Sequence, residues 1–153
     1  MQLSKGFDYA IRSLVFLALS PKGRPAELKA ISEAQGIPVS YLAKLMRSLV
    51  RSGIVASTLG RDGGYTLRRR PEAVSLLEVY EAIEGRLRLV ECLEGDGRCS
   101  LVRDCTQASV WRKLKITVEG FLGETTLKAL LPAPKGAGVQ GKAKERMHAR
   151  AGA

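Results

Sequence analysis

The chain has 153 residues, of which 45% are hydrophobic and 26% charged, a composition typical of a soluble globular protein rather than a disordered one. Its apolar runs are too short to span a bilayer and its first residues lack a signal-peptide pattern, so we expect a cytoplasmic protein with no membrane partner. The formal net charge of +10 favours a polyanionic partner, although part of the excess lies near the C-terminus.

Three helices are predicted in the first third of the chain. Residues 6–20 repeat apolar side chains with the helical period. A second helix is predicted from Pro25, because proline is tolerated at the first helical position, to about Gln35. A third is predicted over about residues 39–52, with Gly53 as its stop. Two short helices joined by a glycine-containing turn are typical of a helix-turn-helix.

The residues that follow change from the helical to the strand period. Residues 54–58 and 65–67 predict two short strands, and the glycine-rich residues 60–64 predict the turn between them. Arg61 lies at the tip of this hairpin. A hairpin directly after a helix-turn-helix indicates a winged helix.

The last part of the fold is predicted to be helical again. Ser75 and Glu78 match a capping box, which predicts a helix to about residue 84. Residues 85–105 are expected to form a loop. A long helix is predicted from about residue 106, with a seam suited to helix–helix packing at Trp111, Leu114, Val118 and Phe121.

The helix predicted over residues 39–52 divides into two faces. Leucines lie on one face, and the donors Ser40, Lys44 and Arg47 lie on another, with Tyr41 near the start of the helix. The second helix of a helix-turn-helix enters the major groove by its N-terminal residues. We therefore expect these four side chains to contact DNA, with Lys44 donating to guanine edges and Ser40 and Tyr41 contacting phosphates or base edges.

The predicted hairpin offers a second set of DNA contacts. Arg61 can reach an adjacent minor groove, and Gly63 and Gly64 allow the backbone to approach phosphates closely. Helix pairs, hairpins and solvated basic side chains each occur in many folds. Their ordered combination is much less common and favours DNA binding.

All three cysteines fall close together, at Cys92, Cys99 and Cys105. An odd number of thiols cannot all pair within one chain, and the spacing lacks the close pair typical of a structural zinc site. The spacing therefore favours an iron–sulfur cluster, with unrelated thiols or an oxidisable pair as the alternative. The fourth ligand is open, because the single histidine, His148, lies in the C-terminal tail.

These features together resemble the Rrf-two-type family of winged-helix transcription regulators. The resemblance covers roughly residues 1–131, and besides the cysteines it is carried by residues 3–10, 37–42 and 60–65. It implies a homodimer, joined by the long C-terminal helix, that binds a pseudo-palindromic double-stranded DNA operator. It also implies that the three cysteines hold a [2Fe–2S] or [4Fe–4S] cluster whose state alters DNA binding.

Two positions depart from branches of that family. The branch that regulates cluster biogenesis has a histidine three residues after the last cysteine, where this chain has Ala108. In the nitric-oxide-sensing branch, an aspartate of the partner subunit completes the site, and Asp8 matches that position; its ordinary role is to stabilise the helix dipole. The cysteine spacing is one residue longer than in both branches and nearer to the iron-regulating branch. The signal therefore stays open among nitric oxide, iron or cluster supply, and redox stress.

The prediction is a mainly α protein with a winged helix-turn-helix and a long C-terminal dimerisation helix. Residues 1–70 form the DNA-binding region, residues 71–131 the cluster-binding loop and dimerisation helix, and residues 132–153 a flexible basic tail. The expected function is an iron–sulfur-dependent repressor. The alternative is a cluster-free winged-helix regulator that senses thiol oxidation or a small molecule. An enzyme is not expected, because a nucleophilic cysteine normally needs a nearby base and the single histidine lies in the C-terminal tail.

Overall fold

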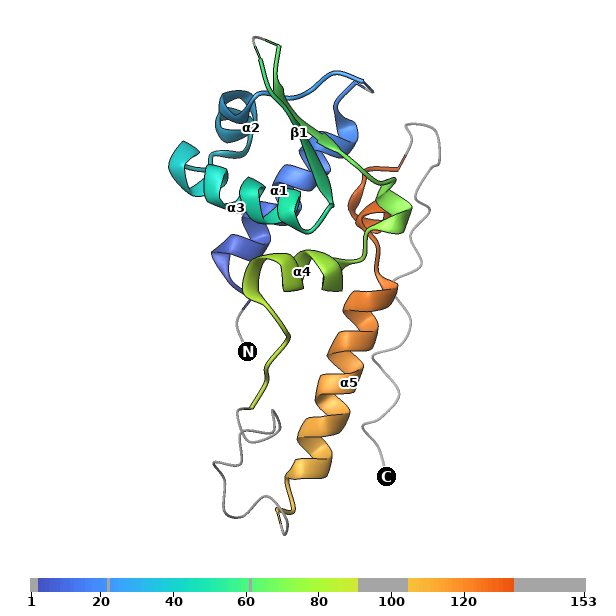
Figure 1. Cartoon of the computed structure of the whole chain (residues 1–153). Coiled ribbons are helices and arrows are strands. Elements are labelled where there is room, and N and C mark those ends of the chain that lie inside the picture. The colour runs from blue at the N-terminus through green and yellow to red at the C-terminus, as the bar shows by residue number, and fades with distance from the viewer. Residues whose placement is uncertain (1–2, 22, 61, 91–104, 134–153) are drawn as a thin grey trace, which may run out of the picture.

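The structure, a computed structural model, describes residues 3–21, 23–60, 62–90 and 105–133. It is mainly α-helical, with a small two-stranded sheet, and one long helix extends away from the remaining elements (Figure 1). None of the helices in these ranges combines the length and apolar character that crossing a membrane requires. In chain order the elements are α1 (Lys5–Leu19), α2 (Leu28–Gln35), α3 (Val39–Arg51), β1 (Val55–Thr58), β2 (Gly64–Leu67), η1 (Pro71–Ala73), α4 (Leu76–Glu84), α5 (Ala108–Glu124) and η3 (Leu127–Leu130).

Helix α1 lies at the centre of the hydrophobic core. Its N-cap is Ser4, whose hydroxyl oxygen accepts a hydrogen bond from the backbone N–H of Phe7 at 3.0 Å. The apolar stripe predicted for residues 6–20 is buried and contacts α2, α3 and α4. α1 therefore supports the helix-turn-helix on one side and α4 on the other.

Helix α2 begins three residues later than the sequence indicated. Ala26 forms an isolated antiparallel bridge with Tyr65, in which two backbone hydrogen bonds of 2.9 Å join the residues. Because both backbone groups of Ala26 are bound to the hairpin, Pro25 and Ala26 are extended rather than helical, and the helix begins at Leu28. The turn to α3 is as predicted, since Gly36 takes the left-handed conformation, with φ of 63°.

Strands β1 and β2 form the predicted antiparallel hairpin, with Val55 opposite Leu67. The bridge from Ala26 adds a third extended segment beside β2. A Cβ atom at Gly64 would lie 2.5 Å from the carbonyl oxygen of Ala26, and a Cβ atom at Gly63 would overlap the carbonyl oxygen of Thr58. Both glycines are therefore required by the packing of the hairpin itself.

The capping box of α4 is present as predicted and is tied to the end of the hairpin. The Ser75 hydroxyl accepts a hydrogen bond from the backbone N–H of Glu78, and the Glu78 carboxylate accepts one from the backbone N–H of Ser75 at 2.9 Å. Arg69 donates to the same carboxylate at 2.6 Å. Burial raises the pKa of Glu78, but the hydrogen bonds from Arg69 and Ser75 outweigh it, so that the pKa lies below the ordinary value of 4.5.

The lowered pKa of Glu78 predicts a pH-dependent contribution to stability. Because its pKa is depressed in the folded state, this contribution is complete above the unfolded pKa and is lost as the pH falls through the folded pKa. Since the pair is partly exposed, we expect Glu78→Gln to lower the free energy of unfolding by only about 1 kcal/mol at neutral pH. In urea titrations, the difference from wild type should shrink as the pH is lowered below 4.5.

The matched control is Glu33→Gln, which removes an exposed carboxylate 3.8 Å from Lys29 on the surface of α2. Its effect should stay within about 0.5 kcal/mol at every pH. Equal losses in the two variants, or a Glu78→Gln difference that does not change with pH, would contradict the assignment.

Helix α5 packs on the core near its C-terminal end and contacts α4 (Figure 1). The predicted seam divides between two faces. Val118 packs against the chain's own core, beside the buried Leu122, whereas Leu114 and Phe121 are exposed. At about 100° per residue, Leu114 and Phe121 lie about 20° apart around the helix, whereas Val118 lies about 40–60° to one side of them.

Candidate nucleic-acid interface and cysteine segment

Helix α3 has the two faces that the sequence indicated. Ser40, Lys44 and Arg47 are exposed on one side. The opposite side enters the core through Leu42, Leu45, Met46 and Leu49, all of which are buried. The core thus fixes α3 by its apolar face and leaves its donor face accessible.

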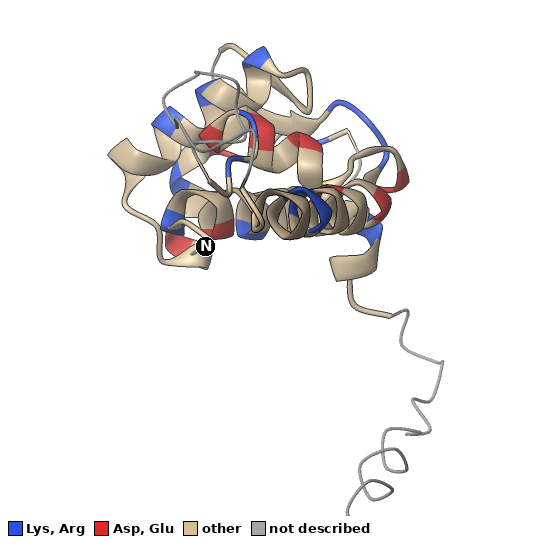
Figure 2. Cartoon of the chain, turned by 90° about the horizontal axis from the view of Figure 1, so that it is seen from below, with Lys and Arg blue, Asp and Glu red and all other residues tan. Residues whose placement is uncertain are grey.

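The exposed face of α3 borders a groove of about 500 Å³ beside the hairpin. No carboxylate lines this groove, whose described lining consists of Lys44, Arg47, Ser48, Val50, Arg51, Ser57 and Tyr65. Three positively charged side chains therefore face one side of the hairpin without an acidic neighbour in the lining. Positive charge is not confined to this helix, since Lys and Arg also occur on other elements (Figure 2).

Arg51 belongs to this surface although sequence reasoning did not select it. It follows Arg47 by four residues and Lys44 by seven, which places all three on one helix face. That spacing would have been sufficient to find it. The Arg51 guanidinium donates to the Ser48 hydroxyl at 3.2 Å, which orients it along the groove.

Tyr41 is positioned by helix α1. Its ring meets the ring of Tyr9 edge-on, with the centroids 5.9 Å apart, and 39% of the residue is exposed. Its hydroxyl lies beside Gly6, where an added Cβ atom would be 3.0 Å from that oxygen. Tyr41 therefore anchors the start of α3 to α1 while leaving part of its surface accessible.

The structure describes one of the three cysteines. Cys105 is a free, half-buried thiol, and its carbonyl oxygen accepts a hydrogen bond from Ala108 N–H at 3.2 Å as α5 begins. Cys92, Cys99 and the hairpin-tip Arg61 lie outside the described residues. Ala108 itself is buried. Within residues 3–90 and 105–133, where described, no three His, Cys, Asp or Glu side chains gather to hold a metal ion.

Asp8 lies in the first turn of α1 and is exposed. Its carboxylate pairs with Arg12 at 3.7 Å, and Arg12 also donates to the carbonyl oxygen of Gln35 at the end of α2. In Figure 1 the start of α1 lies far from the start of α5, where Cys105 is found. One chain therefore does not bring Asp8 and Cys105 together.

Comparisons with known proteins agree with a winged-helix arrangement of the described elements. A family model described as Rrf2, iron-dependent transcriptional regulator, matches residues 3–133. The chain belongs to the Rrf2 family. It is also 34% identical over 131 residues to the HTH-type transcriptional regulator IscR of Escherichia coli, a match that covers 86% of this chain and 80% of that protein. The family and its relatives are transcription regulators, so the chain is a DNA-binding regulator and not an enzyme.

Solved structures of Rrf2-type regulators share the fold. CymR, the global cysteine regulator of B. subtilis, superposes with a TM-score of 0.70 at 28% identity, covering 85% of this chain and 95% of that one. IscR of T. potens gives a TM-score of 0.65 at 29% identity, covering 85% of each chain. The oxidized form of Staphylococcus aureus CymR gives 0.68 at 27% identity, covering 88% and 98%. The winged-helix fold is therefore confirmed.

Proposed function

We propose that this chain is a cytoplasmic, homodimeric repressor that binds a pseudo-palindromic DNA operator under the control of an iron–sulfur cluster. The observation that carries the DNA-binding part is the groove between α3 and the hairpin. It presents Lys44, Arg47 and Arg51 with no carboxylate in its lining. Such a surface suits a phosphate backbone and the acceptor-rich edges of guanine.

Each group of predicted contacts has a place in this proposal. Ser40, Tyr41, Lys44 and Arg47 would enter the major groove from α3, since the N-terminal half of a recognition helix meets the base edges. The hairpin would meet the adjacent minor groove through Arg61, with Gly63 and Gly64 allowing close approach of the backbone. The two glycines are also needed for the hairpin to close.

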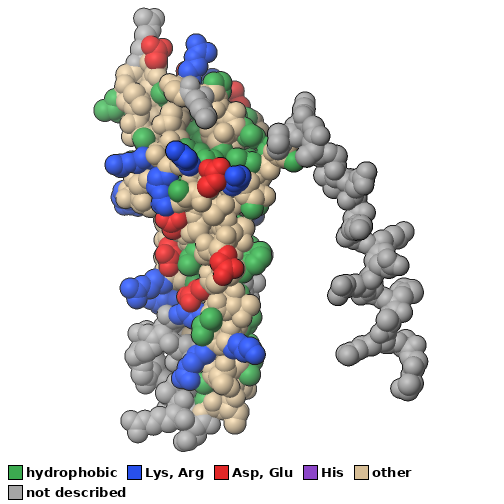
Figure 3. Space-filling model, turned by 90° about the vertical axis from the view of Figure 1, so that its right-hand side faces the viewer, with side chains coloured by type: hydrophobic (Ala, Val, Ile, Leu, Met, Phe, Trp, Pro, Cys, Tyr) green, Lys and Arg blue, Asp and Glu red, His purple; other side chains and the backbone are tan. Residues whose placement is uncertain are grey.

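Dimerisation through α5 is supported by the apolar side chains that it leaves uncovered. Val110, Leu114 and Phe121 are 60%, 43% and 66% exposed. Residues spaced by four, seven and eleven lie close to one line along a helix, so these three form a stripe. Green side chains are visible along the length of α5 in Figure 3. A second copy of α5 would cover such a stripe.

The cysteines have the donor chemistry that an iron–sulfur cluster requires. Cys105 is free and half-buried, and thiolates are the natural ligands of such clusters. We assign Cys92, Cys99 and Cys105 as ligands of a [2Fe–2S] or [4Fe–4S] cluster, with Asp8 of the partner subunit as the fourth. A bound cluster would supply a centre that reacts with nitric oxide or oxidants and is lost when iron is scarce.

The second candidate is a cluster-free regulator that senses thiol oxidation. Two observations favour it: Cys105 carries a free thiol, and the similar CymR of Staphylococcus aureus has been solved in an oxidized form. In that case an oxidant would join two of the three cysteines. Iron analysis of the protein purified without oxygen separates the two candidates.

The DNA-binding proposal predicts a large loss of affinity on replacing both Lys44 and Arg47 with alanine. A duplex selected from a random pool by the wild-type protein serves as the probe. Because each base or phosphate contact contributes about 1–3 kcal/mol, the double variant should bind this duplex at least roughly 30-fold more weakly. Fluorescence anisotropy should also show a weaker dependence of its affinity on salt.

The charge-matched control is Arg86→Ala/Arg112→Ala, which removes two exposed guanidinium groups outside the winged-helix unit. Its affinity should change by less than about threefold. An equal loss in both double variants would show that net charge alone governs binding, and the assignment of α3 would be wrong.

A further inference from the structure

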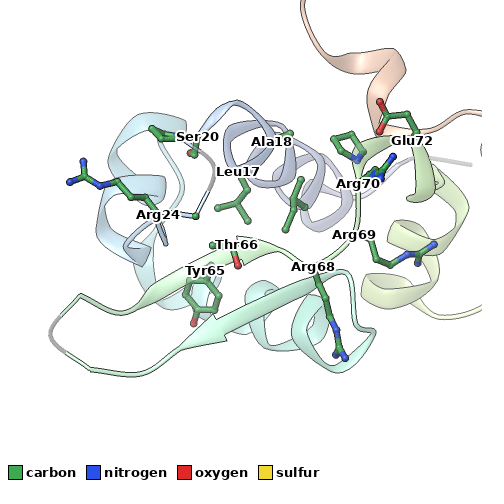
Figure 4. A pocket seen from close by; sticks show the side chains of 14 residues that line it. Leu17, Ala18, Ser20, Arg24, Tyr65, Thr66, Arg68, Arg69, Arg70 and Glu72 are labelled. Atoms are coloured by element: carbon green, nitrogen blue, oxygen red, sulfur yellow. The ribbon is translucent and has the colours of Figure 1, made fainter.

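A second cavity, of about 760 Å³, lies between strand β2 and the end of helix α1. It is bounded by the end of α1, by Pro21, Gly23 and Arg24, by strand β2 and by the start of η1 (Figure 4). Apolar side chains make part of its wall, namely Leu17, Ala18, Pro21, Tyr65 and Pro71. The DNA-binding proposal makes no use of this cavity.

The third extended segment beside the hairpin, at Ala26, forms a single bridge. Tyr65 is bonded to Ala26 through both of its backbone groups, and the Arg68 N–H donates to the Ile54 carbonyl oxygen at 3.0 Å. Since backbone groups alternate between the two edges of a strand, the N–H and C=O of Leu67 point to the same edge as those of Tyr65. Leu67 lies two residues beyond the Ala26 bridge and lines the cavity.

Positive charge surrounds the cavity. Arg24, Arg68 and Arg70 line it, are exposed, and form no ion pair within the part of the chain that the structure describes. Figure 4 shows the side chains of Arg24 and Arg68 extending outward from the rim. The single carboxylate in the described lining is Glu72, which pairs with Lys128 at 3.3 Å. The guanidinium groups of Arg24 and Arg68 are therefore available to an anion, whereas Arg70 lies near enough to Glu72 to help lower the pKa of that carboxyl.

This cavity is separate from the surface that we assign to DNA. The two hollows share only Tyr65 among their described lining residues, since Lys44, Arg47 and Arg51 line the groove whereas Arg24, Arg68 and Arg70 line the cavity. The basic side chains of the two hollows are therefore different, although Tyr65 lines both. A DNA duplex held by α3 through the groove is therefore not the natural occupant of the cavity.

We propose that this cavity binds a phosphorylated small molecule of nucleotide size. Guanidinium groups form paired hydrogen bonds to phosphate oxygens. The apolar wall suits the uncharged body of such a ligand. The volume also falls within the range of roughly 300–1,000 Å³ found for small-molecule sites.

The test is calorimetric titration of the full-length protein with ADP in the absence of DNA. Wild type should bind ADP saturably, with a Kd of about 100 µM. The double variant Arg68→Ala/Arg70→Ala should weaken this binding at least about tenfold, because hydrogen bonds to charged groups are among the stronger ones. Its melting temperature should match wild type, since both side chains are exposed.

The control is Lys44→Ala/Arg47→Ala, which removes the same charge from the other basic surface and should leave ADP binding within about twofold of wild type. Four results would overturn the proposal: no saturable binding up to about 5 mM ADP, equal losses in the two double variants, a loss confined to Lys44→Ala/Arg47→Ala, or a loss of affinity for the selected duplex in Arg68→Ala/Arg70→Ala without any ADP binding. The last result would make the cavity arginines a second DNA contact. Because the titration contains no DNA and requires no cluster, its outcome is independent of the proposed function.

Discussion

Replacing Cys92 with alanine is expected to abolish the visible absorption of the protein purified without oxygen. If three thiolates hold the cluster, loss of one leaves too few strong ligands to retain it. Bound iron and acid-labile sulfide should fall to less than about a tenth of the wild-type values. Cys99→Ala and Cys105→Ala should behave in the same way, because the proposal gives the three cysteines equal roles. The measurements are anaerobic visible spectroscopy together with iron and sulfide analysis.

His148→Ala is the control, since this residue is the single histidine of the chain and has no part in the proposed ligand set. It should keep the full spectrum. Asp8→Ala tests the fourth ligand and should change the spectrum or the rate of cluster loss without removing iron at once. A colourless wild-type protein that forms a disulfide under oxidant, detected by mass spectrometry, would reject the cluster and favour the thiol-oxidation candidate.

Local sequence signals were sufficient to predict an element where one local interaction determines its structure. Ser75 and Glu78 cap α4 through bonds between residues three positions apart, and Gly36 takes the left-handed turn that its position predicted. Helix α3 divides into an apolar and a polar face because its apolar residues recur with the helical period and all face one core. These features depend on near neighbours in the chain, so periodicity and capping rules predict them.

Predictions were incomplete where residues far apart in the sequence meet. Pro25 is compatible with a helix start, but Ala26 pairs with Tyr65, and nothing near Pro25 in the sequence indicates that bridge. Gly64 was selected for approach to DNA, whereas its closest neighbour is the carbonyl oxygen of Ala26. The cavity between β2 and α1 is lined by residues far apart in the sequence, so it could not be predicted either.

Helix α5 shows the same limit, because its sequence does not identify what its apolar side chains pack against. The spacing of Trp111, Leu114, Val118 and Phe121 predicted a single seam, yet this helix has two apolar faces. Val118 faces the chain's own core, while Leu114 and Phe121 remain exposed. Periodicity identifies apolar positions but does not say which are covered within the chain. The uncovered ones are the positions at which dimerisation can be tested.

The double variant Leu114→Asp/Phe121→Asp is therefore expected to be monomeric. Two carboxylates in the centre of an apolar helix–helix contact cannot be buried without a large cost, whereas both positions are already exposed in the single chain and should tolerate them. Because a monomer engages one half-site at a time, affinity for a two-half-site duplex should fall at least roughly 100-fold, as expected when tethering is lost. Sedimentation equilibrium and anisotropy measure the two effects.

Arg112→Asp provides a control with the same change in net charge, at an exposed position of α5 outside the Val110, Leu114 and Phe121 stripe. It should remain dimeric, because a helical residue two positions before Leu114 faces away from the stripe. If Leu114→Asp/Phe121→Asp remains dimeric, the stripe does not form the interface. If it becomes monomeric but binds the duplex as tightly as wild type, dimerisation is not what holds the two half-sites, and recognition by paired winged helices is wrong. Only the combined loss of the dimer and of operator affinity agrees with α5 joining two DNA-binding units.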